Sequence, residues 1–73
     1  MPFIHVKLLA DVLTPAQKKD VITKLTDTMV SIEGENARPV TWVVLEEVKS
    51  GEWGIGGVPL TTEAALALIA GRK

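Results

Sequence analysis

The sequence predicts a single α+β domain in which a β-α-β unit is followed by a glycine hairpin and a short extra helix. Polar and apolar side chains alternate over residues 3–9, a helical pattern of apolar residues runs from 14 to 33, and residues 40–45 are almost continuously apolar. A strand, a long helix and a second strand in this order form a right-handed unit with parallel strands. Because a chain of 73 residues makes one domain, we assign residues 1–73 to one unit.

The alternation in residues 3–9 predicts a strand with two different faces. One face is built for a core, and the other mixes an aromatic ring with polar groups. The core face carries Ile4, Val6 and Leu8, and the other face carries Phe3, His5 and Lys7. We expect His5 to be a half-exposed strand residue, because nothing nearby in the sequence orients it for catalysis.

A strong helix start follows a short connection. Thr14 can cap the helix, Pro15 suits the first helical position, and Gln17 completes a capping box. Gly34 suits a left-handed C-terminal cap. The apolar residues between them form one stripe wide enough to pack on a sheet. They are Val21, Ile22, Leu25, Met29 and Ile32.

The second strand is expected at residues 40–45. Its continuous apolar character predicts that both faces are buried, one of them by another subunit. Arg38 precedes Pro39, which favours extended backbone at Arg38 and places it where this strand begins. In a parallel pair, the Arg38 end of this strand lies at the same end of the sheet as Pro2.

The glycine-rich segment 51–57 predicts a tight hairpin that presents Trp53, because its four glycines permit positive φ angles. It is not a dinucleotide-binding loop, since no strand-to-helix context accompanies it. The last helix is expected to begin at a cap, Thr61 or Thr62, and to run through Ala70. Its alanine- and leucine-rich sequence predicts packing against a neighbouring subunit.

Composition predicts self-association. A single core in so short a chain contributes only about 3–5 kcal/mol unless it is reinforced. The sequence has no cysteine for a disulfide, yet 47% of its residues are hydrophobic and its mean hydropathy is +0.26. Oligomerisation is therefore the reinforcement that we expect.

Charge and hydropathy exclude several classes of function. The net charge of −1, with no basic block, excludes nucleic-acid binding, and no apolar run has the ~20 residues of a membrane span. One histidine without a carboxylate cluster makes no metal site. Because the sequence shows neither an export signal nor cysteines, we expect a cytoplasmic protein.

The first two residues, Met1 and Pro2, carry the main chemical possibility. A small second residue favours removal of the methionine, which would make Pro2 an N-terminal secondary amine. An α-amino group titrates near ~8 in water, and apolar surroundings pull its pKa toward neutrality. Pro2 would then be a general base at cellular pH.

With these segments assigned, the chain resembles the oxalocrotonate tautomerase family, whose members have an N-terminal proline. The resemblance covers roughly residues 2–60 and rests on Pro2, the helix start at 15–18, the strand at 43–45 and the glycine hairpin at 51–57. It implies β-α-β subunits paired into dimers, with three dimers forming a homohexamer. It also implies an isomerase that moves a proton between oxygen and carbon of a small unsaturated 2-oxo acid, with no cofactor.

Two positions match the family's functional residues. By this resemblance Pro2 is the general base, and Trp53 is the hairpin aromatic that closes the pocket. The family's two arginines are missing: one position falls near Val12 or Leu13, and the other on Trp42. Arg38 is the cation best placed to replace them. The candidate substrate-binding residues are therefore Arg38, Trp53 and Trp42, with Lys7 and Lys49 as weaker cations.

Two other functions stay open. A lyase-type relative would hydrate or dehalogenate an unsaturated acid, with Pro2 as the acid and Glu52 or Glu47 activating water. Alternatively, the chain is a non-catalytic homologue, or one subunit of a hetero-oligomer whose partner supplies the arginines.

Overall fold

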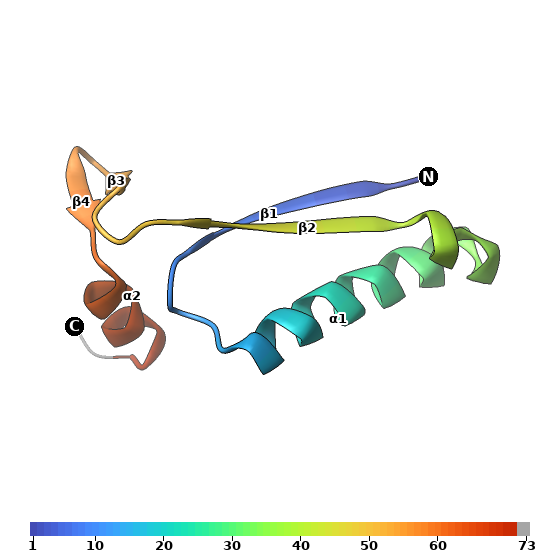
Figure 1. Ribbon diagram of the computed structural model, residues 1–73, viewed down its shortest axis with the longest axis horizontal. Coiled ribbons are helices and arrows are strands. Elements are labelled where there is room, and N and C mark those ends of the chain that lie inside the picture. Colours follow the sequence, from blue (N-terminus) through green and yellow to red (C-terminus); the bar gives the residue numbers. More distant parts are fainter. Residues whose placement is uncertain (72–73) are drawn as a thin grey trace.

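The computed structural model describes residues 1–71 and contains the predicted β-α-β order, hairpin and extra helix (Figure 1). The elements in chain order are β1 (Phe3–Leu9), α1 (Pro15–Glu33), the 3₁₀ helix η1 (Glu35–Val40), β2 (Trp42–Val48), β3 (Trp53–Ile55), β4 (Val58–Leu60) and α2 (Thr62–Ile69). In this described part, no helix is long and apolar enough to cross a bilayer.

β1 and β2 form a parallel pair whose register runs from Phe3 opposite Trp42 to Leu9 opposite Val48. α1 covers one face of this pair (Figure 1). Alternate residues of β1 are half-buried and exposed, as the sequence pattern predicts, and Leu9 is buried at its end. The other face of β2 is exposed in the single chain, so its burial by another subunit stays a prediction.

The predicted bounds of β2 were wrong. We expected a strand at 40–45, but η1 occupies 35–40 and the strand extends to Val48. The side-chain hydroxyl of Thr41 donates to the carbonyl oxygen of Ala37 over 2.8 Å, which closes the 3₁₀ turn before the strand starts. The strand continues through two glutamates because β1 pairs with it along its whole length.

α1 begins with the predicted capping box. The amide of Gln17 donates to Thr14 Oγ1 over 3.1 Å, and the amide of Thr14 donates to Gln17 Oε1 over 2.9 Å. The apolar stripe is only partly covered, because two strands are too narrow to bury it: Ile32 is 74% exposed. Val30, which lies outside the predicted stripe, is the buried residue of α1.

β3 and β4 form the predicted hairpin, with Gly56 and Gly57 at positive φ angles of 60° and 82° in the turn. Such angles match the hairpin turn to the twist of its strands. α2 is capped by Thr61, whose hydroxyl accepts from the amide of Ala64 over 3.1 Å. Thr62 ties this helix to the end of the sheet, since its hydroxyl donates to the carbonyl oxygen of Ala10 over 2.7 Å.

The single chain is too open for a compact monomer. Area scaling predicts roughly 4,400 Å² of accessible surface for its mass, whereas the chain exposes 5378 Å². Its radius of gyration is 14.9 Å, against about 11 Å for a compact domain of this length. Among the described residues only Leu9, Val30 and Ala65 form a buried core.

Candidate active site

Pro2 lies beside the first residue of β2. The amide of Trp42 donates to the carbonyl oxygen of Pro2 over 3.0 Å, and Phe3 is the strand partner of Trp42. The rings of Phe3 and Trp42 have their centroids 6.4 Å apart at an angle of 38°. Both side chains are largely exposed, by 63% and 56%. The structure thus brings the predicted base and one predicted binding residue, Trp42, to the same end of the sheet.

Arg38 lies just before β2, as expected, but its side chain is engaged. Its Nη1 donates to Asp27 Oδ1 over 2.8 Å, and its Nε donates to Glu35 Oε1 over 2.7 Å. The hydrogen bond from Arg38 holds the pKa of Glu35 below its usual value, and the two carboxylates raise the pKa of Arg38. A guanidinium has five N–H groups. Since a third donates to Glu35 at 3.5 Å, two N–H groups of Arg38 remain for another acceptor.

Trp53 is remote from Pro2 within one chain. β3 follows the Val48 end of β2, whereas Pro2 precedes the opposite end, where Phe3 pairs with Trp42. Seven-residue strands place these ends about 20 Å apart. Figure 1 shows the N-terminus and the hairpin at opposite ends of the molecule. The structure therefore does not bring Trp53 and Pro2 together in the single chain.

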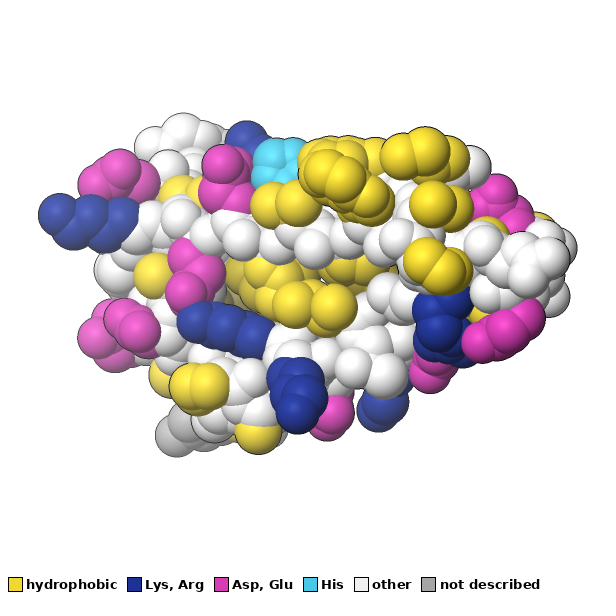
Figure 2. Space-filling model, turned by 45° about the vertical axis from the view of Figure 1, so that its right-hand side comes forward, with side chains coloured by type: hydrophobic (Ala, Val, Ile, Leu, Met, Phe, Trp, Pro, Cys, Tyr) yellow, Lys and Arg dark blue, Asp and Glu magenta, His cyan; other side chains and the backbone are white. Residues whose placement is uncertain are grey.

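The exposed sheet face changes from apolar to polar along its length. Figure 2 shows hydrophobic side chains gathered beside the histidine on this face. Farther along, Glu46 Oε1 lies 3.4 Å from His5 Nε2 and 3.5 Å from Lys7 Nζ. Lys7, a weaker cationic candidate, is therefore paired with a carboxylate away from Pro2.

The acidic residue nearest the N-terminus is Glu33, which the sequence analysis missed. The amino group of Met1 lies 3.7 Å from Glu33 Oε2. The signal was available, because a helix that returns between two parallel strands ends near the start of the first strand. Glu47, considered as a water-activating group, is bonded instead to Lys18 Nζ at 2.5 Å and to the amide of Asp11 at 3.2 Å.

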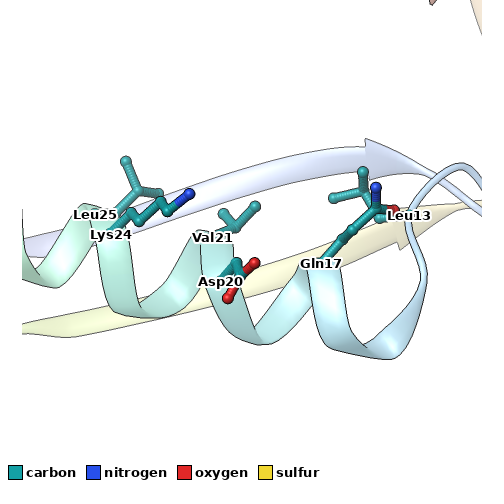
Figure 3. Close-up of a pocket in the computed structure, with 6 residues that line it drawn as sticks. All are labelled: Leu13, Gln17, Asp20, Val21, Lys24 and Leu25. Carbon is teal, nitrogen blue, oxygen red and sulfur yellow. The ribbon is translucent and has the colours of Figure 1, made fainter.

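An open hollow of about 440 Å³ lies on the flank of α1 and not at Pro2. In Figure 3 the side chains of Leu13, Val21 and Leu25 point to the same side of the helix. Gln17, Asp20 and Lys24 complete its lining. None of the predicted site residues lines it, so we interpret it as uncovered apolar surface.

At the Pro2 end of the sheet, this arrangement can support proton transfer. Pro2 directly precedes Phe3 of the ring pair, Glu33 lies 3.7 Å from the amino group of Met1, and Arg38 lies in η1 just before β2. Over residues 1–71, no three His, Asp or Glu side chains gather as metal ligands would.

Comparisons with known proteins agree with this geometry. The family model described as tautomerase enzyme matches residues 2–63. The probable tautomerase K2 of Dickeya dadantii is 38% identical over 61 residues, covering 84% of this chain and 90% of the relative. A probable tautomerase of Helicobacter pylori is 36% identical over 59 residues, covering 78% of this chain and 85% of the relative.

Two solved structures share the fold. A 4-oxalocrotonate tautomerase homologue superposes with a TM-score of 0.72 at 30% identity, covering 81% of this chain and 90% of the other. The apo form of an unfused 4-OT superposes with a TM-score of 0.72 at 31% identity, covering 88% of this chain and 98% of the other. The chain therefore belongs to the tautomerase family of enzymes, in its 4-oxalocrotonate tautomerase-like branch.

Proposed function

We propose that this enzyme catalyses the keto–enol tautomerisation of a small unsaturated 2-oxo acid, with Pro2 as general base once Met1 has been removed. The observation that carries the proposal is the position of Pro2. Its carbonyl oxygen accepts a hydrogen bond from the amide of the first residue of β2, and it adjoins the Phe3–Trp42 ring pair. The family match begins at Pro2, which supports the same assignment.

The proposed reaction needs one base and one cation. The nitrogen of Pro2 removes the proton from the enol oxygen and returns it to carbon, so the substrate is isomerised without net loss of atoms. Aromatic walls disfavour the ammonium form of the base. The two free N–H groups of Arg38 hold the substrate carboxylate or the developing enolate oxygen. No cofactor takes part, because the proton moves within one substrate.

The proposed site is shared between subunits. Since Trp53 follows one end of the sheet and Pro2 precedes the other, about 20 Å away along the strands, Trp53 closes the pocket of a neighbouring copy. The surface excess of roughly 1,000 Å² over a compact monomer exceeds the ~800 Å² per partner of a standard interface. We propose a homohexamer built as a trimer of dimers. The cytoplasmic location stays a prediction from the sequence.

The deciding experiment follows the decay of an enol, such as enolic phenylpyruvate, with wild type and Pro2→Ala. The intact mass of the protein made in its own host first establishes whether Met1 is removed. We expect the wild type to lack Met1 and Pro2→Ala to lose at least about a hundredfold in kcat/KM. Retention of Met1, or equal rates for the two proteins, would remove Pro2 from the mechanism.

A lyase is the second candidate, favoured by the position of Glu33 near the N-terminus. In that reaction the protonated Pro2 donates a proton to an unsaturated acid while the carboxylate of Glu33 activates water. Glu33→Gln would then abolish hydration of a 2,3-unsaturated acid. In a tautomerase the same variant leaves enol decay almost unchanged.

A non-catalytic homologue, or a chain that needs a different subunit, is the remaining alternative. Native mass spectrometry of the purified chain tests it. An active homo-oligomer would exclude both possibilities, whereas an inactive monomer would favour them.

A further inference from the structure

Thr62 fastens the hairpin that carries Trp53 to the end of the β1–β2 sheet. Its backbone amide donates to Ser50 Oγ over 2.9 Å, and its hydroxyl donates to the carbonyl oxygen of Ala10 over 2.7 Å. Ser50 directly precedes the glycine-rich segment, and Ala10 directly follows β1. Ala10, Ser50 and Thr62, which we call the Thr62 clasp, therefore join the base of the hairpin to the sheet. Figure 1 shows β3, β4 and α2 grouped at this end of the molecule.

The anchor point at Ala10 is itself held by the sheet. The amide of Ala10 donates to the carbonyl oxygen of Val48 over 2.7 Å, which continues the parallel ladder past the end of β1. The amide of Asp11 belongs to the same planar peptide group as the Ala10 carbonyl, and it donates to Glu47 Oε2 over 3.2 Å. Because Glu47 holds the N–H side of this peptide group and Thr62 holds its C=O side, the clasp has a fixed support.

Trp53 lies close to the clasp along the chain. It is the third residue after Ser50, and its strand partner Leu60 is the second residue before Thr62. The amide of Gly51 donates to the carbonyl oxygen of Leu60 over 3.0 Å, so the two arms of the hairpin are closed just beyond the clasp. Two or three extended residues span roughly 7–11 Å. A movement at the clasp therefore reorients the indole of Trp53 directly.

We propose that Thr62 is a positioning residue for Trp53, because the clasp holds the hairpin in the orientation in which the indole closes the pocket of a neighbouring copy. This inference rests on the proposed function and adds a residue that touches neither the substrate nor Pro2. An isolated pair of three-residue strands is only marginally stable. Losing one hydrogen bond shifts an equilibrium about fivefold, so without the clasp the closed orientation is less populated and the apparent affinity falls by that fraction.

The first test needs no substrate. Trp42 and Trp53 are the two tryptophans of the chain, so Trp42→Phe leaves the hairpin indole as the only reporter. In this background, Thr62→Val removes the hydroxyl that donates to Ala10 and keeps the shape of the side chain and the amide that donates to Ser50. We expect the fluorescence anisotropy of Trp53 to fall and its quenching by acrylamide to rise about twofold or more, because the hairpin leaves its single orientation.

Three further variants assign the change to the clasp. Thr62→Ser keeps the hydroxyl and should restore the wild-type anisotropy and quenching. Thr26→Val removes a hydroxyl that donates to the Ile22 carbonyl over 2.8 Å within α1, and it should change neither signal. Ser50→Ala removes the acceptor of the other clasp bond and should shift both signals in the same direction as Thr62→Val. Native mass spectrometry verifies the assembly of each variant, and Ser50→Ala replaces Thr62→Val in every arm if the latter does not assemble.

The second test asks which chain needs the clasp. One chain carries Pro2→Ala and supplies Trp53, the other carries Trp53→Ala and supplies Pro2, and the two are refolded jointly. Adding Thr62→Val to the chain that supplies Trp53 should raise KM for enol decay about fivefold, with a smaller effect on kcat. Adding it to the chain that supplies Pro2 should leave KM unchanged. A residue that only stabilises the fold would have the same effect in either chain.

The outcomes separate this inference from the proposed function. Unchanged anisotropy and quenching of Trp53 in Thr62→Val would overturn the inference, whether or not the protein turns over an enol. Equal KM changes from either chain, or no KM change from the chain that supplies Trp53, would also overturn it. A wild type without turnover, in which Thr62→Val still loosens Trp53, would sink the proposed function and leave the clasp standing.

Discussion

Pro2 and Trp53 lie at opposite ends of the sheet that β1 and β2 form (Figure 1). A site that uses both must therefore take them from different chains. Mixing Pro2→Ala and Trp53→Ala tests this, because each chain then carries one defect. After unfolding and joint refolding at equal amounts, about a quarter of the sites should contain both native residues.

The measurement for this mixing experiment is enol decay. We expect about a quarter of wild-type activity from the mixture and nearly none from either variant alone. Mixing the two variants without unfolding is the control, and it should stay inactive. No recovery after joint refolding would mean that each site uses Pro2 and Trp53 of the same chain. Activity of Trp53→Ala alone close to that of the wild type would mean that the site does not use Trp53.

Arg38 is predicted to bind the substrate carboxylate despite its two ion pairs. Arg38→Gln should raise KM about tenfold, with a smaller effect on kcat, because hydrogen bonds to charged groups are lost. The complementary change is Asp27→Asn with Glu35→Gln, which frees the guanidinium and should lower KM. If Arg38→Gln lowers the melting temperature but leaves KM unchanged, Arg38 serves only the junction of α1 and η1.

The pair between Lys18 and Glu47 predicts a pH-dependent stability. The hydrogen bond from Lys18, helped by the amide of Asp11, lowers the pKa of Glu47 in the folded chain. Because the pKa of this carboxyl is lower in the folded chain than in the unfolded chain, it stabilises the fold at pH values above the unfolded pKa. This stabilisation is lost as the pH falls through the folded pKa. Lys18→Gln should therefore lower the melting temperature by a few degrees at most at pH 7.

The difference between wild type and Lys18→Gln should vanish at an acid pH below the lowered folded pKa of Glu47, where this carboxyl is protonated in both states. Thermal unfolding followed by circular dichroism at the two pH values measures it. Lys19→Gln removes the same charge from the neighbouring exposed position and is the matched control. An equal difference at both pH values would show that Lys18 acts through something other than Glu47.

α2 is predicted to pack against a second copy. Ala65 faces its own chain, while Leu68 and Ile69 are 62% and 71% exposed. Only its first two residues lie within the family match, so this contact would be an addition to the shared fold. Leu68→Glu combined with Ile69→Glu should weaken assembly at least about tenfold, since two aliphatic side chains lose their burial.

Sedimentation or light scattering over a dilution series measures that assembly. Glu63→Gln changes charge on the same helix without touching the apolar residues and should assemble like the wild type. An unchanged dissociation profile for the double variant would place α2 on the outer surface of the assembly.

Local patterns predicted much of the fold. The alternation in residues 3–9 marked β1 correctly, and Thr14, Pro15 and Gln17 marked the start of α1. Glycines with positive φ marked the hairpin turn. The start of β2 was misplaced because Pro39 also fits a 3₁₀ helix. The hydrogen bond from the Thr41 hydroxyl to the carbonyl oxygen of Ala37 stabilises that helix instead of an extended strand.

The candidate site was less predictable. The parallel pairing correctly brought Pro2, Arg38 and Trp42 to one end of the sheet. The engagement of Arg38 by Asp27 could not be foreseen, because eleven positions separate them in the chain. Glu33 was missed although the predicted β-α-β order already places the end of α1 near the start of β1, and so near the N-terminus.

The sequence by itself determined the β-α-β order, the N-terminal helix caps, the hairpin and the family, because these depend on residues close together along the chain. Only the tertiary structure decided which charges are already paired, which rings stay exposed and how far Trp53 lies from Pro2. Those relationships depend on strand register and helix direction, which bring distant residues together or hold them apart.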